Sequence, residues 1–406
     1  MIRLPTHDHG VPALEHLLGD GAPLVVGEVF APFGITVESL RAAQVRYVPG
    51  RSVTVEFQAE LRMPDGSEST DTVGASSGLR LAGPVATVER NGAEIAVWRY
   101  PHDPELPGLA QVTDPDRLRS TLTDISVEPR SLHLRRRSYR ATRRAALEIT
   151  TDTAHLYMKV LQPSKVKRVH ELHRELSAVL PVPRSHGLLE KGGVIFLEAI
   201  DGLPIRRLIE SGQPIPNPAQ LLALLDSFPA PAKHHVRVAD PVGRVGDHVR
   251  LLSTLLPEAA GRMASLVDQI VVDHDAEPER LIHGDFHTMQ VLTVGGAVSG
   301  LVDIDTCGIG SHSVDLAAYL GQLSVLALAG KAAPAFSAHG RAALAEFDQR
   351  VDPSVLRLRA AAHVLGLATG PFRVQEAAWP DNTLDRIALV ERWITSAAGT
   401  DASVFN

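Results

Sequence analysis

The chain has 406 residues, of which 44% are hydrophobic and 21% charged, as is ordinary for a soluble globular protein. This length exceeds one ordinary hydrophobic core and predicts two or three domains or lobes. The net charge of −7 argues against a nucleic-acid partner held by electrostatic attraction. The single cysteine, Cys307, excludes an intrachain disulfide and a multi-cysteine zinc site.

The hydrophobic residues do not form a membrane span. No uninterrupted apolar run reaches the length that a bilayer requires, and the first residues lack the apolar core of a secretory signal. We therefore expect a cytoplasmic protein with no membrane partner. Composition leaves open whether it is a monomer or a homodimer.

Residues 1–125 are predicted to form a mixed domain of their own. Val53, Val55 and Phe57 alternate with polar residues, as in a half-buried strand, and residues 94–100 form a further strand candidate. Residues 101–108 are rich in proline and end in glycine, a composition typical of a loop or linker.

Residues 126–203 predict a small lobe of mixed helix and strand. Strands are expected at residues 145–149, 155–161 and 194–200, and an amphipathic helix at residues 165–180, ended by Pro181 and Pro183. From residue 204 onward the pattern is mostly helical, with helices expected at residues 219–225, 248–256 and 262–273 and after Asp315. A loop and hairpin at residues 281–305 interrupt these helices.

The loop and hairpin carry the most informative residues of the chain. Asp285 lies in a tight turn beside Gly284, Gln290 follows five residues later (290 − 285), and Asp303 follows eighteen residues later (303 − 285). Phosphoryl transfer from a magnesium nucleotide needs one carboxylate that receives the acceptor hydroxyl and two oxygen ligands that hold the metal. Kinase catalytic machinery has the same order of groups. The spacing predicts a phosphotransferase with Asp285 as catalytic base and Gln290 and Asp303 as metal ligands.

Neighbouring polar residues are given smaller roles. His283 is expected to brace the loop by hydrogen bonds. His287 is assigned a similar structural role, with substrate contact as the alternative. Asp305 would share the side-chain direction of Asp303 if the strand continued, so it could join the metal site. Asp315 is interpreted as the N-cap of the following helix.

A phosphate anchor is expected on a strand of the small lobe. Lys159, between apolar neighbours, fits this role, and a carboxylate of the next helix should hold it; we prefer Glu175 to Glu171. The backbone of Glu198 and Ile200 is predicted to bind the adenine edge at a hinge between lobes. The preceding turn, residues 140–144, is basic and lacks the glycines of a phosphate loop.

The motif from His283 to Gln290, with Asp303 and Asp315, resembles the aminoglycoside phosphotransferase and choline kinase-like superfamily. That superfamily usually has Asn at the position of Gln290. The Gln variant resembles the actinobacterial maltokinase and glucosamine kinase branch. The resemblance implies an α+β, bilobal protein-kinase-like fold with a small sheet-rich lobe and a large helical lobe. It also implies an extra N-terminal cap domain. The expected parts are a cap at 1–125, an N-lobe at 126–203 and a helical C-lobe at 204–406.

The resemblance further implies ATP and Mg2+ as cofactors and a small-molecule sugar or amino sugar as acceptor. Arg373, Glu376 and Trp379 cluster in a break between helical stretches and are candidate acceptor contacts, because an aromatic face and carboxylates suit an amino sugar. For Trp379, a helix–helix packing role is the preferred interpretation. An aminoglycoside or another small alcohol remains an alternative acceptor.

Two other classes of function compete with a kinase. A pseudokinase-like nucleotide-binding module would follow if Gln290 weakened the metal site. A metallohydrolase would follow if His283, Asp285 and His287 bound a catalytic metal. The metallohydrolase reading does not account for Lys159 or for the order of the two lobes.

Overall fold

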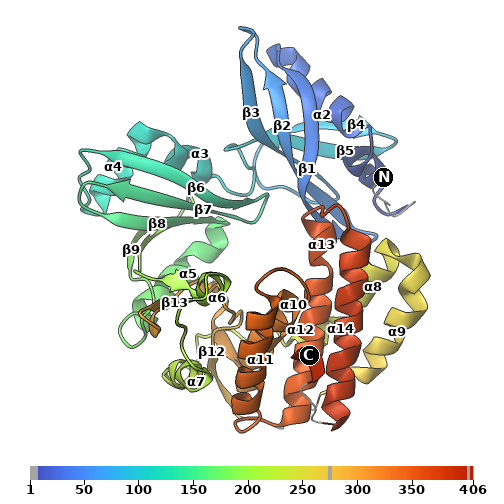
Figure 1. Cartoon of the computed structure of the whole chain (residues 1–406). Helices are drawn as coiled ribbons and strands as arrows, with labels where there is room; N and C mark the ends of the chain where they lie inside the picture. The colour runs from blue at the N-terminus through green and yellow to red at the C-terminus, as the bar shows by residue number, and fades with distance from the viewer. Residues whose placement is uncertain (1–7, 273–276, 400–402, 406) are drawn as a thin grey trace. The chain divides into compact units, whose positions relative to one another are not determined.

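The computed structural model describes residues 8–272, 277–399 and 403–405. The chain divides into two compact units. The first contains Met1–His170, Ser185–Ala199 and Phe372–Ala377, and the second contains Glu171–Arg184, Ile200–Pro371 and Ala378–Asn406. Figure 1 labels their helices and strands.

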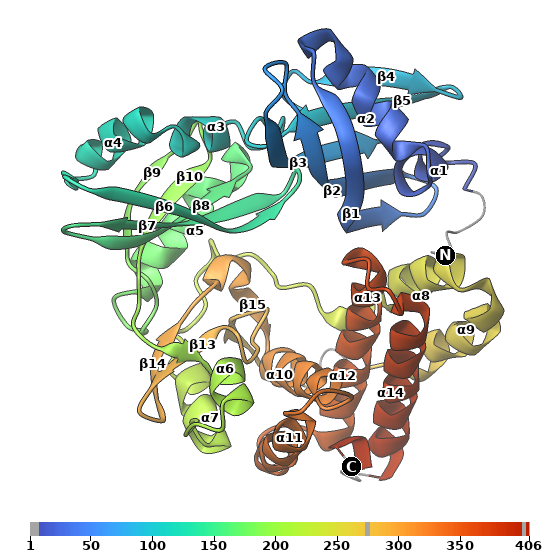
Figure 2. The ribbon, with the colours of Figure 1, turned by 45° about the horizontal axis from the view of Figure 1, so that its top comes forward.

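The first sheet of the first unit is antiparallel, with strand order β1-β2-β3-β5-β4. Its strands are β1 (Thr36–Val48), β2 (Ser52–Arg62), β3 (Glu68–Ser77), β4 (Ala86–Arg90) and β5 (Ala93–Arg99). It is preceded by α1 (Ala13–Leu18), α2 (Ala22–Phe30) and the 3-10 turn η1 (Ala31–Phe33). Helix α2 packs against β1 and β4 (Figure 2). The strands expected around residues 53–57 and 94–100 are confirmed as β2 and β5.

The second sheet of the first unit is also antiparallel, with strand order β6-β7-β8-β10-β9. Its strands are β6 (Leu132–Arg140), β7 (Arg144–Thr151), β8 (His155–Leu161), β9 (Ser185–Leu189) and β10 (Val194–Glu198). The accompanying helices are α3 (Gly108–Thr113), α4 (Pro115–Asp124) and α5 (Pro163–Leu176). The expected helix at residues 165–180 is therefore present but ends at Leu176, several residues before the prolines.

Opposite faces of the second sheet pack against different helices. Leu147 and Met158 share a buried cluster with residues of α3 and α4, which cover that face (Figure 2). Ile195 on the other face packs against Val166 of α5. Lys159 stands directly opposite Ile195 in the ladder and therefore shares the α5 face of the sheet.

The two sheets of the first unit share one hydrophobic core. Trp98 of β5 lies in the same buried cluster as Tyr139 of β6, and its Nε1–H donates to the Tyr139 hydroxyl at 3.0 Å. That hydroxyl donates to Oδ2 of Asp103 at 2.7 Å. Leu106, in the segment expected to be a linker, is fully buried in this cluster. The N-terminal sheet is thus packed against its neighbour within one unit.

The shared core corrects the expectation of a half-buried strand at residues 53–57. Besides the apolar residues, Thr54 and Glu56 of β2 are buried as well. Thr54 and Ser76 share a hydrogen bond at 2.9 Å, and the carboxylate of Glu56 accepts the backbone N–H of Ala141, in the turn between β6 and β7. The polar face of the strand is covered by that turn and is not open to solvent.

The second unit is mostly helical and contains two small sheets. The sheets are β11 (Leu203–Pro204), β13 (Val291–Val294) and β14 (Ala297–Leu301), and β12 (Glu279–Ile282) with β15 (Gly308–Ser311). The helices are α6 (Ile205–Glu210), α7 (Pro218–Asp226), α8 (Val245–Leu255), α9 (Ala260–Gln269), α10 (His312–Leu326), α11 (Ala333–Phe347), α12 (Pro353–Ala368), α13 (Gly370–Arg373) and α14 (Trp379–Gly399). Single 3-10 turns are η2 (Pro241–Arg244), η3 (Pro257–Ala259), η5 (Ile304–Thr306) and η6 (Ser403–Phe405).

Helices α10, α12 and α14 pack side by side in the second unit (Figures 1 and 2). The helices expected at residues 219–225 and 248–256 are confirmed as α7 and α8. The third, expected at residues 262–273, is α9, which ends at Gln269; residue 273 lies outside the described residues. Within the described part of the chain, no helix combines the length and apolar character that a bilayer crossing requires.

The hydrogen bonds of Tyr139 yield a stability prediction. Tyr139→Phe leaves the buried Trp98 Nε1–H without its acceptor and removes a donor from Asp103, so the free energy of unfolding should fall by about 1–3 kcal/mol. The matched control is Tyr157→Phe, since the Tyr157 hydroxyl donates to Glu148 from a partly exposed position. Urea denaturation should give a loss below about 1 kcal/mol for the control. Equal losses for the two variants would contradict the buried network.

Candidate functional site

The loop that carries Asp285 begins where β12 ends at Ile282. Gly284 adopts a φ of +80°, and a Cβ at this position would lie 2.7 Å from the carbonyl oxygen of Thr306. Both the conformation and the close approach require glycine. Phe286, after the turn, is buried and stacks on Tyr319 with ring centroids 5.4 Å apart. The loop is therefore fixed on both sides of Asp285.

Asp315 of α10 anchors the same loop. Its carboxylate is completely buried and accepts the backbone N–H groups of His283 at 2.7 Å and of Gly284 at 2.8 Å. Burial raises the pKa of Asp315 to about 7 even though these two hydrogen bonds favour the ionised form, and the charge of Asp285 adds to the rise. Interpretation of Asp315 as an N-cap is wrong, because α10 begins at His312.

His283 braces the loop from inside. Its ring Nε2–H donates to the carbonyl oxygen of Val302 at 3.0 Å, and its Nδ1 accepts the backbone N–H of Asp285 at 3.3 Å. Thr306 adds a hydrogen bond from its hydroxyl to the His283 carbonyl oxygen at 3.0 Å. These bonds give His283 the structural role that its position in the motif indicated.

Asp285 presents its carboxylate to solvent from this rigid backbone. Its side chain is 42% exposed, and its Oδ2 lies 3.9 Å from Nε2 of His287. A carboxylate that is accessible but held on a fixed loop can receive a hydroxyl group without large rearrangement.

Gln290 and Asp303 lie together because of the β13–β14 hairpin. The register pairs Val291 with Leu301, and the N–H of Val302 donates to the Gln290 carbonyl oxygen at 2.9 Å. Nε2 of Gln290 lies 3.3 Å from Oδ2 of Asp303. Asp303 itself has a φ of +60°, in the left-handed region. The two expected metal ligands are thus adjacent.

The orientation of the Gln290 carboxamide follows from the protonation of His287. Nδ1 of His287 accepts the backbone N–H of Met289 at 3.2 Å, and burial, together with the charge of His283, lowers the pKa of His287 to about 4. The neutral ring therefore carries its proton on Nε2, which lies 3.2 Å from the Gln290 amide group. That proton requires an acceptor, so the amide oxygen belongs at this position.

With the amide oxygen in that position, two oxygens meet. As placed, Nε2–H of Gln290 donates to Oδ2 of Asp303 at 3.3 Å; with the carboxamide turned over, its oxygen would face that carboxylate oxygen. Two facing oxygens repel unless a cation or proton lies between them. Carbonyl and carboxylate oxygens are the ligands that Mg2+ prefers, so the residues present fit a magnesium ion.

Asp305 does not lie on the same strand face as Asp303, which a continuous strand would have required. It lies in η5, since the left-handed turn at Asp303 ends the extended chain. Its Oδ1 lies 3.9 Å from Nε2 of the buried His173, whose Nδ1–H donates to the carbonyl oxygen of Pro183 at 2.7 Å. The side chain of Asp305 therefore faces α5.

Glu175 of α5 is held by two histidines. Nε2 of His234 lies 2.9 Å from its carboxylate, and Nε2 of His235 lies 3.2 Å away. Burial would raise the pKa of Glu175, but these hydrogen bonds outweigh it and hold the pKa below its usual value. Glu175 is therefore an ionised carboxylate in a fixed position.

The ligand atoms of Glu175, His234 and His235 lie within 4.8 Å of one another, as in a metal site. The hydrogen bond at the other nitrogen of His235 argues against this reading. Its Nδ1 accepts the backbone N–H of Ala232 at 2.9 Å, so the neutral ring carries its proton on Nε2. A metal at Nε2 would have to displace that proton and break the bond to Ala232.

The remaining candidates lie on several elements. Lys159 is on β8, and Glu198 is the last residue of β10. The chain passes from the first unit to the second between Ala199 and Ile200, as expected near a hinge. Ile200 packs against Gly300, where a Cβ would lie 2.6 Å from its side chain.

The expected acceptor cluster is only partly suited to a ligand. Arg373 is exposed and Glu376 is half-buried, and both belong to the first unit. Trp379, in the second unit, is 1% exposed. Its ring face is not available for a sugar, so the expectation of a stacking contact is wrong and the packing interpretation fits.

Sequence reasoning missed several residues that position the site. Gln322 accepts hydrogen bonds from both the backbone N–H and the hydroxyl of Thr288, at 3.1 and 2.7 Å. His173 was also missed, and Asp315 was noticed but assigned the wrong role. Only the position of Asp315 within the recognised motif gave a usable signal, because the others act through tertiary contacts.

Comparison with known proteins identifies the family. Residues 140–358 match the phosphotransferase enzyme family, and the chain belongs to it. The expected enzyme class is thereby confirmed. No curated protein sequence matches the chain.

Two solved structures share the fold at low identity. One is a thermostable mutant of the aminoglycoside phosphotransferase APH(4)-Ia in complex with AMP-PNP and hygromycin B, at 13% identity and a TM-score of 0.50. The match covers 70% of this chain and 99% of that one. The other is choline kinase from Cryptosporidium parvum Iowa II, at 9% identity and a TM-score of 0.50, covering 72% and 100%. The expected α+β kinase-like fold is confirmed.

The role of Asp315 can be tested by Asp315→Asn. An amide keeps the size of the side chain but can accept only one of the two N–H groups, so the free energy of unfolding should fall by about 2–3 kcal/mol. Amide hydrogen exchange at His283 and Gly284 should accelerate. Asp381→Asn is the matched control, because Asp381 is exposed in the first turn of α14. Its loss should stay below about 1 kcal/mol, and a control effect as large as that of Asp315→Asn would refute the anchoring role.

Proposed function

We propose that the protein transfers the γ-phosphoryl group of ATP, with Mg2+, to a hydroxyl group of a small sugar or amino sugar. The observation that carries this proposal is the series of neighbouring side chains Asp285, His287, Gln290 and Asp303, in which an accessible carboxylate lies near a carboxamide that contacts a second carboxylate. Membership of the phosphotransferase family supplies the reaction class.

Asp285 would act on the acceptor. Its accessible carboxylate would hydrogen-bond the acceptor hydroxyl, orient it for in-line attack and take its proton late in the transfer. The hydrogen bonds of Asp315 and His283 to the loop backbone would keep that orientation fixed. No covalent phosphoenzyme is needed.

Gln290 and Asp303 would hold the magnesium ion through their facing oxygens. Bound there, the ion would neutralise charge on the nucleotide phosphates. Neutral His287 would keep the Gln290 oxygen turned toward the metal by donating its Nε2–H. This arrangement would make Gln290 a competent ligand in place of Asn, which is why we prefer an active kinase to the pseudokinase alternative.

Residues of the first unit and of α5 would bind the nucleotide. Lys159 would contact the α- and β-phosphates, and Glu175 is the preferred carboxylate to hold it. The backbone of Glu198 and Ile200 would accept the adenine edge. These assignments rest on the family resemblance and on the order of the elements along the chain.

The acceptor class is the least constrained part. Gln290 is typical of the maltokinase and glucosamine kinase branch, which favours a sugar or amino sugar. Glu376 offers a carboxylate that suits an ammonium group, and Arg373 suits hydroxyls or an anion. The alternative acceptor is an aminoglycoside or another small alcohol, in keeping with the hygromycin B that the similar structure binds.

Asp285→Asn tests the catalytic base. Turnover should fall by at least about 10²-fold while nucleotide affinity stays nearly unchanged, because the amide cannot take the proton. A coupled ADP-release assay and a nucleotide titration measure the two quantities. Near-normal turnover in this variant would remove Asp285 from the role.

The metal assignment is tested by comparing two neighbouring carboxylates. Asp303→Asn should raise the magnesium concentration for half-maximal activity by at least about tenfold, because a direct ligand loses its charge. Asp305→Asn should leave it near the unmodified value, since Asp305 faces His173. If instead Asp305→Asn raised this magnesium concentration and Asp303→Asn did not, Asp305 and not Asp303 would be the metal ligand.

A further inference from the structure

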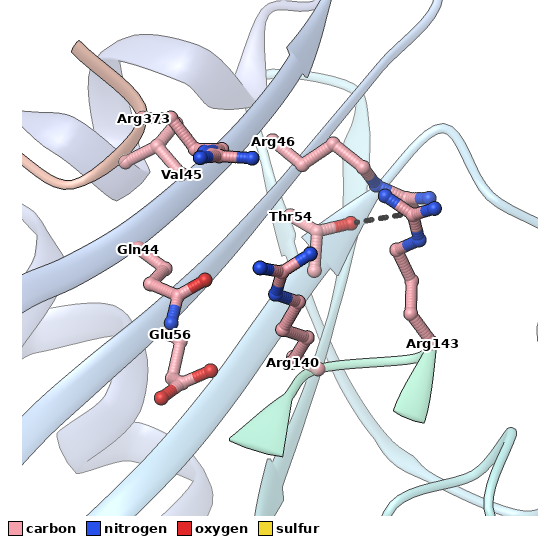
Figure 3. Close-up of a pocket in the computed structure, with 9 residues that line it drawn as sticks. Gln44, Val45, Arg46, Thr54, Glu56, Arg140, Arg143 and Arg373 are labelled. Atoms are coloured by element: carbon pink, nitrogen blue, oxygen red, sulfur yellow. Dashed lines mark hydrogen bonds between the residues drawn. The ribbon is translucent and has the colours of Figure 1, made fainter. Parts of the chain in front are cut away.

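Two adjoining cavities in the first unit are each lined by four basic side chains among nine residues. The larger has a volume of about 340 Å3 and the smaller about 50 Å3, and Arg46 and Arg143 line both (Figure 3 shows the smaller). The larger cavity also contains the side chains of Arg80 and Lys165. Lys159, which we assign to the nucleotide, lines neither.

The carboxylate in the larger cavity is already engaged. Oε1 of Glu105 accepts the backbone N–H of Ala82 at 2.7 Å, and its Oε2 accepts the side-chain amide of Gln162 at 2.9 Å. A single carboxylate therefore faces Arg46, Arg80, Arg143 and Lys165. Among the residues that line this cavity, basic side chains outnumber carboxylates four to one.

The basic groups repel one another. Burial and the charges of Arg143, Arg168 and Arg46 lower the pKa of Lys165. Arg46 is half-buried, and its NH2 group donates to the neutral hydroxyls of Thr142 at 3.3 Å and Thr54 at 3.5 Å.

A buried carboxyl group in the smaller cavity is a second observation that points to a ligand. Glu56 is 8% exposed and lines this cavity, and among the described residues its Oε2 has no hydrogen-bond partner. Burial raises the pKa of Glu56 to about 7. At neutral pH its carboxyl group is therefore in part protonated and can donate to an anion as well as accept from a hydroxyl. The guanidinium groups of Arg46, Arg140 and Arg143 gather on one side of this pocket, with Arg373 on another (Figure 3).

We propose that these cavities form a binding site for the phosphate group of a phosphorylated small molecule. Arg46, Arg143 and Lys165 would bind the dianionic phosphate, because guanidinium and ammonium groups form charge-assisted hydrogen bonds with its oxygens. The volume of about 340 Å3 exceeds that of the phosphate alone and leaves room for a small polar body. Neither Asp285 nor Asp303 lines these cavities, and the proposal does not depend on the proposed reaction.

The experiment titrates the full chain with inorganic phosphate, glucose 6-phosphate and glucose by isothermal calorimetry. The unmodified protein should bind the two phosphate-bearing probes, and any binding of glucose at the acceptor site should be the same in the variant below. In Arg143→Ala with Lys165→Ala, which changes two exposed side chains, the dissociation constants of the phosphate-bearing probes should rise by at least about tenfold. Thermal denaturation of this double variant checks that it folds.

Two controls separate the site from its alternatives. Lys167→Ala removes an exposed charge of the same helix that lines neither cavity, and it should leave phosphate binding unchanged. Lys159→Ala should also leave it unchanged, which distinguishes this site from the nucleotide site. Tighter binding of glucose 6-phosphate than of inorganic phosphate would support a site that also holds the sugar body. No phosphate binding, equal binding in the double variant, or its loss in Lys159→Ala would overturn the proposal.

Discussion

The buried carboxylate of Asp315 is the interaction on which the candidate active site depends. An acidic group completely removed from water is unfavourable unless hydrogen bonds compensate, and here the N–H groups of His283 and Gly284 supply them. These N–H groups belong to the turn that leads into Asp285. One buried acceptor thus fixes the backbone of the loop and leaves the Asp285 side chain accessible. Rigidity of the backbone and accessibility of the carboxylate come from the same contact.

The sequence could predict that Gln290 and Asp303 lie together, but not the local geometry around them. Gln290 and Asp303 lie at the two ends of a hairpin whose strands and turn are local features, so their adjacency followed from spacing. The backbone is left-handed at Asp303 and leaves the extended conformation there. Asp305 therefore lies in a 3-10 turn and does not have the side-chain direction that a continuing strand would give it. The role of Asp315 depends on burial against a loop 31 residues away, which no local pattern reveals.

The first unit shows a similar limit. Alternating residues predicted the strands, because one face of each strand is apolar. They did not predict that Thr54 and Glu56 would also be buried, or that Trp98 and Tyr139 would join two sheets in one core. The N-terminal sheet and the sheet that follows it share one buried hydrophobic cluster. The same packing brings arginines of both sheets to the cavities that we assign to a phosphate group.

We propose above all that the side chains from Asp285 to Asp303 perform magnesium-dependent phosphoryl transfer to a small hydroxyl compound. The most direct measurement supplies the unmodified protein with ATP labelled in the γ-phosphate and follows the label across a panel of sugars, amino sugars, aminoglycosides and small alcohols. The account predicts that label appears on a sugar or amino sugar only when magnesium is present. Magnesium-dependent ATP binding with no labelled product from any member of the panel would contradict it.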